Sequence, residues 1–217
     1  MTGRLRLAVL VSGRGSNLQS LIDAQADPKY PAEIVLVLSN VADAYALERA
    51  RQANIATAVL DHKKYPDRKS FDADMTRAIE GAGASLVCLA GFMRLLGDEF
   101  VAHWKNRLIN IHPSLLPAYK GLHVHERVIA DGARFSGCTV HFVRPATDEG
   151  PIVAQAAVPV HPNDTAEALA ARVLAEEHRI YPLAVRLIAE GRVTVDGERA
   201  LIDGWTPPRG TLINPAP

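Results

Sequence analysis

The sequence predicts an α/β protein built on a mainly parallel, twisted sheet, with antiparallel strands in the C-terminal half. Short apolar runs bounded by turn residues alternate with helix-like stretches, which is typical of βαβ units. Several runs are apolar at every position, as expected for strands buried on both faces of a parallel sheet. After residue 135 two further runs follow one another with no helix between them, which favours an antiparallel pair.

Five apolar runs are expected to form the parallel strands, and these are Leu7–Val11, Ile34–Leu38, Ala56–Leu60, Leu86–Ala90 and Leu108–Ile111. Five other stretches have the apolar spacing of helices, and these are Asn17–Ala26, Ala44–Ala53, Ser70–Glu80, Asp98–Trp104 and Val124–Asp131. We expect these helices to cover both faces of the sheet.

The C-terminal half has a different pattern. Antiparallel strands are expected at Gly137–Val143 and Ile152–Val158, and a terminal hairpin at Val193–Val195 and Ala200–Ile202. Residues 205–217 form a Pro-rich tail without apolar periodicity, which we expect to be loosely held. We therefore expect residues 1–204 to form a single domain.

A long helix is expected between the second antiparallel strand and the hairpin. It begins at Asp164 or Thr165, and Asp164 with Glu167 resembles a capping box. Pro182 is expected to bend or end this helix, because proline cannot donate the intrahelical hydrogen bond.

The composition excludes several classes of function. The 217 residues include 24 Lys and Arg and 24 Asp and Glu, so the chain lacks the charge excess of duplex-binding or membrane-surface proteins. A small, anionic ligand fits this balance of charges better than a nucleic acid or a membrane surface does. Cys88 and Cys138 form neither a CxxC pair nor a disulfide framework, which favours a reducing cytoplasm. The apolar run ending at Val11 is too short for a signal peptide or a membrane span.

A glycine-containing loop, Ser12–Asn17, directly follows the first strand and precedes a helix. A helix N-terminus offers free N–H groups and a positive dipole end, so a phosphate is the expected ligand. The third glycine of a dinucleotide fingerprint would fall at Leu18, so that motif is absent. The alternative is that the glycines form only a tight turn and Ser16 or Asn17 only caps the helix.

A second polar cluster, in Asn110–Pro117, lies at the end of the fifth strand. Strand alternation places Asn110 and His112 on one face. Pro113 favours an extended backbone at His112, which holds the imidazole at the carboxyl edge of the sheet, where open α/β sheets bind ligands. The alternative is a structural histidine beside a turn.

Two acidic features are less specific. The loop Ala146–Pro151, taken alone, has the composition of a turn. Glu177 belongs to the inward-facing column of Leu169, Val173 and Tyr181, where a buried carboxylate needs a cation or donor such as a substrate ammonium. The alternative is that the helix turns Glu177 to the rim.

A metal site has little support in the sequence. His123 and His125 lie two residues apart with no further ligand motif, which is weak evidence even with His112 and Asp148 considered. We therefore expect no metal.

Four segments together resemble a known family, and these are Ser12–Leu18, Ala90–Arg94, Asn110–Pro117 and Asp148–Ile152. They are similar to the phosphoribosylglycinamide formyltransferases (glycinamide ribonucleotide transformylases) of the folate-dependent formyltransferase family, from about Leu7 to Leu187. The resemblance implies a Rossmann-like formyltransferase fold, with a nucleotide-binding half at 1–111 and a folate-binding and catalytic half at 112–204.

The resemblance also implies an activity and its residues. The activity is transfer of the formyl group of 10-formyltetrahydrofolate, a cosubstrate, to the primary amine of glycinamide ribonucleotide in purine biosynthesis. The catalytic positions are Asn110, His112 and Asp148. The ribonucleotide positions are Gly15, Ser16, Asn17, Arg107 and Glu177. The folate positions are Arg68, Met93, Arg94, Leu95, Leu96, Asn110, Val143, Arg144 and Asp148, and His141 is a second histidine near the site.

The implied mechanism is direct attack of the amine on the formyl carbon. Asn110 and a protonated His112 stabilise the oxyanion, and Asp148 orients the imidazole and favours its protonated form. Two positions depart from the family pattern. Lys120 stands in place of a proline in the Tyr119–His125 loop, and Leu174 in place of a polar residue that helps to hold the phosphate in some members.

Three alternatives remain. A methionyl-tRNA formyltransferase would carry an additional nucleic-acid-binding domain, and a formyltetrahydrofolate hydrolase would carry an N-terminal regulatory domain before the strand at Leu7. A non-catalytic folate-binding module would have a broken catalytic triad, which is intact here. We therefore expect a cytoplasmic enzyme with small-molecule substrates, no nucleic-acid or membrane partner, and a monomeric or weakly homodimeric state.

Overall fold

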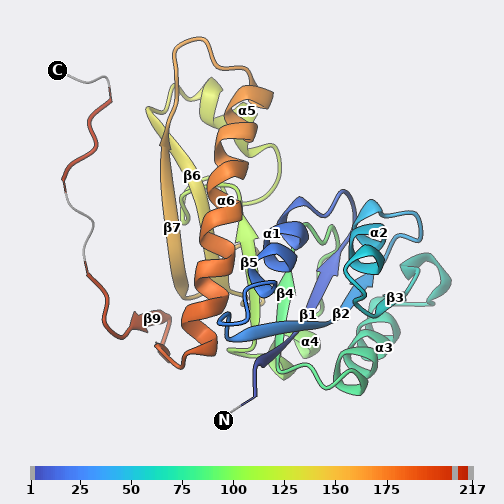
Figure 1. Cartoon of the computed structure of the whole chain (residues 1–217). Coiled ribbons are helices and arrows are strands. Elements are labelled where there is room, and N and C mark those ends of the chain that lie inside the picture. Colours follow the sequence, from blue (N-terminus) through green and yellow to red (C-terminus); the bar gives the residue numbers. More distant parts are fainter. Residues whose placement is uncertain (1–2, 207–209, 215–217) are drawn as a thin grey trace.

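The computed structural model describes residues 3–206 and 210–214, and a seven-stranded sheet lies at its centre (Figure 1). The strand order is β3-β2-β1-β4-β5-β6-β7. The strands are β1 Leu5–Val11, β2 Ala32–Ser39, β3 Thr57–Val59, β4 Leu86–Leu89, β5 Leu108–His112, β6 Phe135–Phe142 and β7 Ile152–Pro159. The strands from β1 to β5 are parallel, whereas β6 and β7 are antiparallel to their neighbours, so the predicted fold class is confirmed.

Helices cover both faces of the sheet. They are α1 Ser16–Gln25, α2 Tyr45–Gln52, α3 Arg68–Gly81, α4 Asp98–His103, α5 Val124–Ala130 and α6 Ala166–Ala189, with a 3₁₀ turn at His62–Lys64. One core cluster joins α1, α2, α5 and α6 to the sheet, and the other joins α3 and α4 to the opposite face. The uninterrupted apolar run Leu7–Val11 in β1 is fully buried because its alternate side chains enter the two clusters.

The strand order reverses between β1 and β4. The chain passes from β1 to β2 and β3 on one side, and then returns to the other side of β1 with β4 and β5. The loops after β1 and β4 therefore leave the same carboxyl edge of the sheet on either side of this reversal. Such a switch point is where open α/β sheets bind ligands.

The long helix α6 differs from the prediction at its start. Thr165, not Asp164, is the N-cap, since its hydroxyl accepts a hydrogen bond from the Ala168 N–H at 3.2 Å. Asp164 instead accepts hydrogen bonds from Arg172 at 2.7 and 2.8 Å and from the His161 N–H at 2.8 Å. The capping box expected for Asp164 is therefore wrong.

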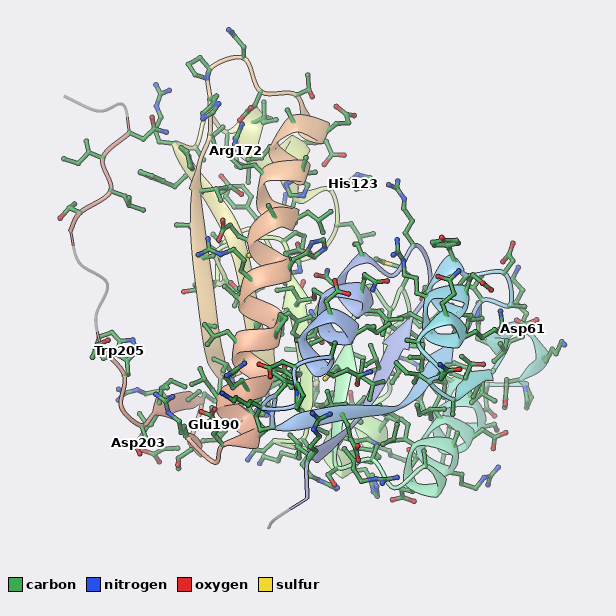
Figure 2. The ribbon with its side chains drawn as sticks, viewed as in Figure 1. Asp61, His123, Arg172, Glu190, Asp203 and Trp205 are labelled. Carbon is green, nitrogen blue, oxygen red and sulfur yellow. The ribbon has the colours of Figure 1, made fainter. Side chains whose placement is uncertain are left out.

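Pro182 does not end α6, which continues to Ala189. Figure 2 shows Arg172 and Glu190 near its two ends. The helix buries eight side chains, including Leu169 and Tyr181, and each large apolar side chain contributes about 1.5–3 kcal/mol on burial. The combined contribution of the buried apolar side chains exceeds the cost of about 3 kcal/mol for an internal proline.

The chain after α6 forms the predicted hairpin. Strands β8 Val193–Asp196 and β9 Arg199–Ile202 pair in antiparallel register. In the following segment Trp205 is 65% exposed, and Asn214 donates to the carbonyls of Arg134 and Val160. The prolines at 207, 208, 215 and 217, part of the tail expected to be loosely held, lie outside the described residues.

Along the part of the chain that the structure describes, the helices are too short or too polar to traverse a lipid bilayer.

The fold makes a first prediction at Tyr181, which is fully buried and donates its hydroxyl proton to the Leu89 carbonyl at the end of β4, at 2.8 Å. We expect Tyr181→Phe to lower the free energy of unfolding by about 1 kcal/mol, because one buried hydrogen bond is lost. Urea unfolding measures the change. Tyr45→Phe, at a tyrosine that is 54% exposed, is the control and should stay within about 0.5 kcal/mol of wild type.

Candidate active site

The loop after β1 brings the first turn of α1 to the carboxyl edge of the sheet. Gly15 is the N-cap and has a left-handed backbone with φ of 72°. A Cβ at this position would lie 2.6 Å from the Ala46 Cβ, so α1 and α2 approach each other here as only glycine allows. The N–H groups of Ser16 and Asn17 have no intrahelical acceptor and are available to an anion.

Asn110 is fixed by His141 on the neighbouring strand, directly across the β5–β6 pair. Nδ1 of His141 lies 3.0 Å from the Phe142 carbonyl oxygen, which can only accept, so the proton resides on Nδ1. Burial lowers the pKa of His141 and keeps the ring neutral. Its Nε2 then accepts from the Asn110 amide at 3.4 Å, which leaves the second amide proton of Asn110 for another acceptor.

His112 and Asp148 meet at the same edge, although 36 positions of sequence separate them. Nδ1 of His112 lies 3.4 Å from Oδ1 of Asp148, and both side chains are almost buried. Nε2 of His112 donates to the Tyr119 carbonyl at 3.0 Å, and the Gly121 N–H donates to Oδ2 of Asp148 at 2.7 Å. The loop after β5 therefore holds both members of the pair.

Glu177 faces inward and is only 7% exposed, so the alternative of a rim position is wrong. The Asn17 amide donates to its Oε2 at 2.7 Å, which ties α6 to the first turn of α1. Burial raises the pKa of Glu177, while the hydrogen bond from Asn17 and the nearby His112 act in the opposite direction. The donor expected for Glu177 is thus a side chain of this protein.

The loop after β4 presents the predicted folate residues to solvent. Met93 is 69% and Leu95 is 71% exposed, an unusual state for large apolar side chains and one that suits an apolar ligand. The loop ends at Gly97, whose N–H donates to the buried Asp72 at 2.7 Å. Cδ of Arg68 would lie 3.8 Å from a Cβ added at Gly97, and both residues line a cavity of about 560 Å³ between α3 and α4.

The loop between β6 and β7 carries Val143, Arg144 and Asp148. Asp148 has a left-handed backbone with φ of 52°, and this turn directs its carboxylate towards His112. The guanidinium of Arg144 donates to Glu198 at 3.0 and 3.2 Å and to Asn106 at 3.0 Å, so the hairpin holds the root of this loop.

Arg107 is not brought together with the other predicted site residues. It precedes the amino end of β5, whereas Asn110 and His112 lie towards the carboxyl end of that strand. Its guanidinium lies 4.7 Å from the centre of the Trp104 ring and donates to the His103 carbonyl at 3.0 Å. Extended geometry separates it from His112 by about 16 Å along the strand.

Sequence reasoning missed the residues that hold the loop after His112. The buried Thr139 hydroxyl donates to the Ser114 carbonyl at 2.7 Å and accepts from the Leu116 N–H at 3.1 Å. Lys120, one of the two departures from the family pattern, donates to Glu149 at 2.6 Å. A charged pair at 120 and 149 is visible in the sequence, but nothing there indicates that the two loops meet.

Within the described ranges, the structure brings together no group of three or more His, Cys, Asp or Glu side chains suited to holding a metal ion.

The close approach at Gly15 makes a second prediction. Gly15→Ala should lower the free energy of unfolding by about 2–4 kcal/mol, because it combines a left-handed alanine with a steric clash. Gly13→Ala is the matched control, since a Cβ there has no atom within 4 Å. Urea unfolding of both variants checks the prediction, and equal losses would contradict it.

The raised pKa of Glu177 makes a third prediction. The native state binds a proton at Glu177 more readily than the unfolded chain does, so its ionisation destabilises the fold as the pH rises. Glu177→Gln should therefore unfold at a higher urea concentration than wild type at about pH 8, and this gain should shrink as the pH falls to about 4.

The control for that comparison is Glu176→Gln on the same helix, where the carboxylate pairs with Arg179 at the surface. It should be neutral or slightly destabilising, because it loses an exposed ion pair. A Glu177→Gln variant less stable than wild type at about pH 8 would contradict the prediction.

Comparison with known proteins places this geometry in a family. The model of the formyl transferase family matches residues 5–185. The phosphoribosylglycinamide formyltransferase of Escherichia coli is 44% identical over 207 residues, 95% of this chain and 98% of that protein. Glycinamide ribonucleotide transformylase 1 from Symbiobacterium toebii superposes with a TM-score of 0.91 at 48% identity, over 93% of this chain and 95% of that chain.

The trifunctional purine biosynthetic protein adenosine-3 of Gallus gallus is 48% identical over 194 residues, 89% of this chain. The match covers 19% of that protein, so the chain spans about a fifth of the length of this relative. These matches confirm the resemblance found in the sequence, and they show that the chain belongs to the formyl transferase family.

Proposed function

We propose that the chain is a phosphoribosylglycinamide formyltransferase, which transfers the formyl group of 10-formyltetrahydrofolate to the primary amine of glycinamide ribonucleotide. The observation that carries the proposal is the convergence of Asn110, His112 and Asp148 at the carboxyl end of β5, the strand next to β4. The E. coli relative carries the same name, and the match extends over 98% of its length.

In the proposed reaction the amine nitrogen attacks the formyl carbon, and the formyl oxygen becomes an oxyanion. The second amide proton of Asn110 and the Nε2 proton of His112 are donated to it. His112 gives that proton to the Tyr119 carbonyl in the structure, so the formyl oxygen takes the place of this acceptor. Donors fixed before the reaction stabilise developing charge without reorganisation.

Asp148 completes the mechanism. A carboxylate beside an imidazole favours the protonated ring and holds its orientation. The intermediate then collapses: the bond between the formyl carbon and the folate nitrogen breaks, and the proton lost by the attacking amine is delivered to that nitrogen. A water beside Asp148 is the proposed carrier of this proton.

The two substrates occupy different loops in this proposal. The phosphate of the ribonucleotide binds the N–H groups of Gly15, Ser16 and Asn17, and Glu177 accepts from its amino end. The folate contacts Arg68, Asn110, the segment Met93–Leu96 and the backbone from Val143 to Asp148. The exposed Met93 and Leu95 support this placement, because an apolar ring system would cover them.

Further parts of the proposal concern partners and surroundings. The substrates are small molecules, and no nucleic acid, membrane or metal takes part. The single domain at 1–204, its two halves, the monomeric or weakly dimeric state and the cytoplasmic location stay predictions.

One assay separates this proposal from the alternatives. Purified protein is mixed with 10-formyltetrahydrofolate, with and without glycinamide ribonucleotide, and loss of the formyl group is followed. Deformylation that requires the ribonucleotide supports the transferase. Equal deformylation without it supports a hydrolase, and binding without deformylation supports a non-catalytic module.

The proposed oxyanion contact makes a fourth prediction. Asn110→Ala should lower kcat by about 100- to 1000-fold while changing the KM values much less, because the donor acts mainly in the transition state. Asn163→Ala, in an exposed loop, is the control and should retain full activity. A folded Asn110→Ala enzyme with a kcat within about threefold of wild type would contradict the role.

The His112–Asp148 pair makes a fifth prediction. His112→Ala and Asp148→Asn should each remove a large part of kcat, because each disables the same proton donor. The double variant should then lose little more than the worse single variant. If the losses in log kcat add instead, the two groups act independently and Asp148 is only a loop carboxylate.

A further inference from the structure

Ser12 joins the two loops that flank the reversal of strand order. Its N–H donates to the Gly91 carbonyl at 3.1 Å, and its Oγ accepts from the Met93 N–H at 2.8 Å. Gly91 has a left-handed backbone with φ of 74°, which lets the chain turn so that both of these groups face Ser12. The first residue after β1 is thus bonded twice to the loop after β4.

Asn40 fixes the direction of the Ser12 hydroxyl. The hydroxyl donates to Oδ1 of Asn40 at 2.6 Å, and the Asn40 amide lies 3.2 Å from Nδ1 of His62. Asn40 is only 4% exposed, so its orientation is held by these partners. Because the hydroxyl has a single proton and Asn40 takes it, a lone pair of Oγ remains directed at the Met93 N–H.

This arrangement links the positions assigned to the two substrates. Ser12 begins the segment that ends in the phosphate-binding residues Ser16 and Asn17, and Met93 begins the segment that contacts the folate. We propose that Ser12 is a positioning residue that couples these segments, so that each substrate binds more tightly when the other is bound. The inference rests on the proposed function.

A purely structural role for Ser12 makes a different prediction. The loop after β4 is also held at its far end, where Asp72 accepts from the Gly97 N–H, so it stays attached without Ser12. If Ser12 only supported the fold, its loss would weaken the binding of each substrate alone and leave their mutual effect unchanged. The mutual effect is therefore the quantity to measure.

The experiment uses glycinamide ribonucleotide and tetrahydrofolate, a pair without a formyl group to transfer. Isothermal titration calorimetry gives the Kd of each ligand with and without saturating amounts of the other. We expect about five- to tenfold tightening in wild type, equal in both directions because binding linkage is reciprocal. In Ser12→Ala the ratio of the Kd without the second ligand to the Kd with it should fall to about one. Ser12→Thr keeps the hydroxyl and should retain most of the wild-type ratio.

Two further variants make the outcome decisive. Asn40→Ala should lose the coupling while Ser12 is intact, and it replaces Ser12→Ala if that variant does not fold. Ser39→Ala is the matched control, because this buried hydroxyl at the same edge bonds the carbonyl and N–H of Val41, two residues along its own chain segment. It should keep the wild-type ratio.

A wild-type ratio of one, a ratio preserved in Ser12→Ala, or an equal loss in Ser39→Ala would each overturn the coupling. Failure of the proposed function looks different. In that case wild type neither binds the ribonucleotide nor transfers a formyl group to it. If wild type transfers the formyl group but its Kd ratio is one, only the inference about Ser12 is wrong.

Discussion

The parallel pairing of β1 with β4 is the constraint on which the rest of the structure depends. It places the chain reversal at the centre of the sheet, so that the loops after both strands leave the same edge side by side. Strand β5 pairs with β4 and brings Asn110 and His112 to that edge, and the antiparallel β6 returns His141 alongside Asn110. A site formed from distant parts of the chain follows from one strand order.

The sequence predicted those features that depend on local pattern. The apolar runs identified the strands of the parallel sheet, most clearly β4 and the run Leu7–Val11 of β1, which are buried on both faces, and alternation placed Asn110 and His112 on one face. Tertiary contacts decided the rest. Thr165 caps α6 because Arg172 engages Asp164, and the turn at Asp148 meets His112 across a loop whose path local pattern does not reveal.

Several polar groups of the candidate site are buried with few partners, and this has an energetic consequence. His141, Glu177 and Asp72 are each at most 7% exposed, and burial shifts the pKa of each towards its neutral form. A buried polar group destabilises the fold unless a hydrogen bond compensates for lost hydration. The helices and strands around the site therefore supply the stability that allows these groups to be held in fixed orientations.

The contact between Glu198 and Arg144 bears on how the protein is handled. This contact attaches the hairpin after α6 to the loop that carries Asp148. The hairpin lies beyond residues 5–185, which the family model matches. Two strands, β4 and β5, lie between β1 and β6, the strand that leads into the Asp148 loop (Figure 1). An affinity tag or fusion partner joined at the C-terminal end can therefore pull on the Asp148 loop, whereas one joined ahead of β1 leaves that loop undisturbed.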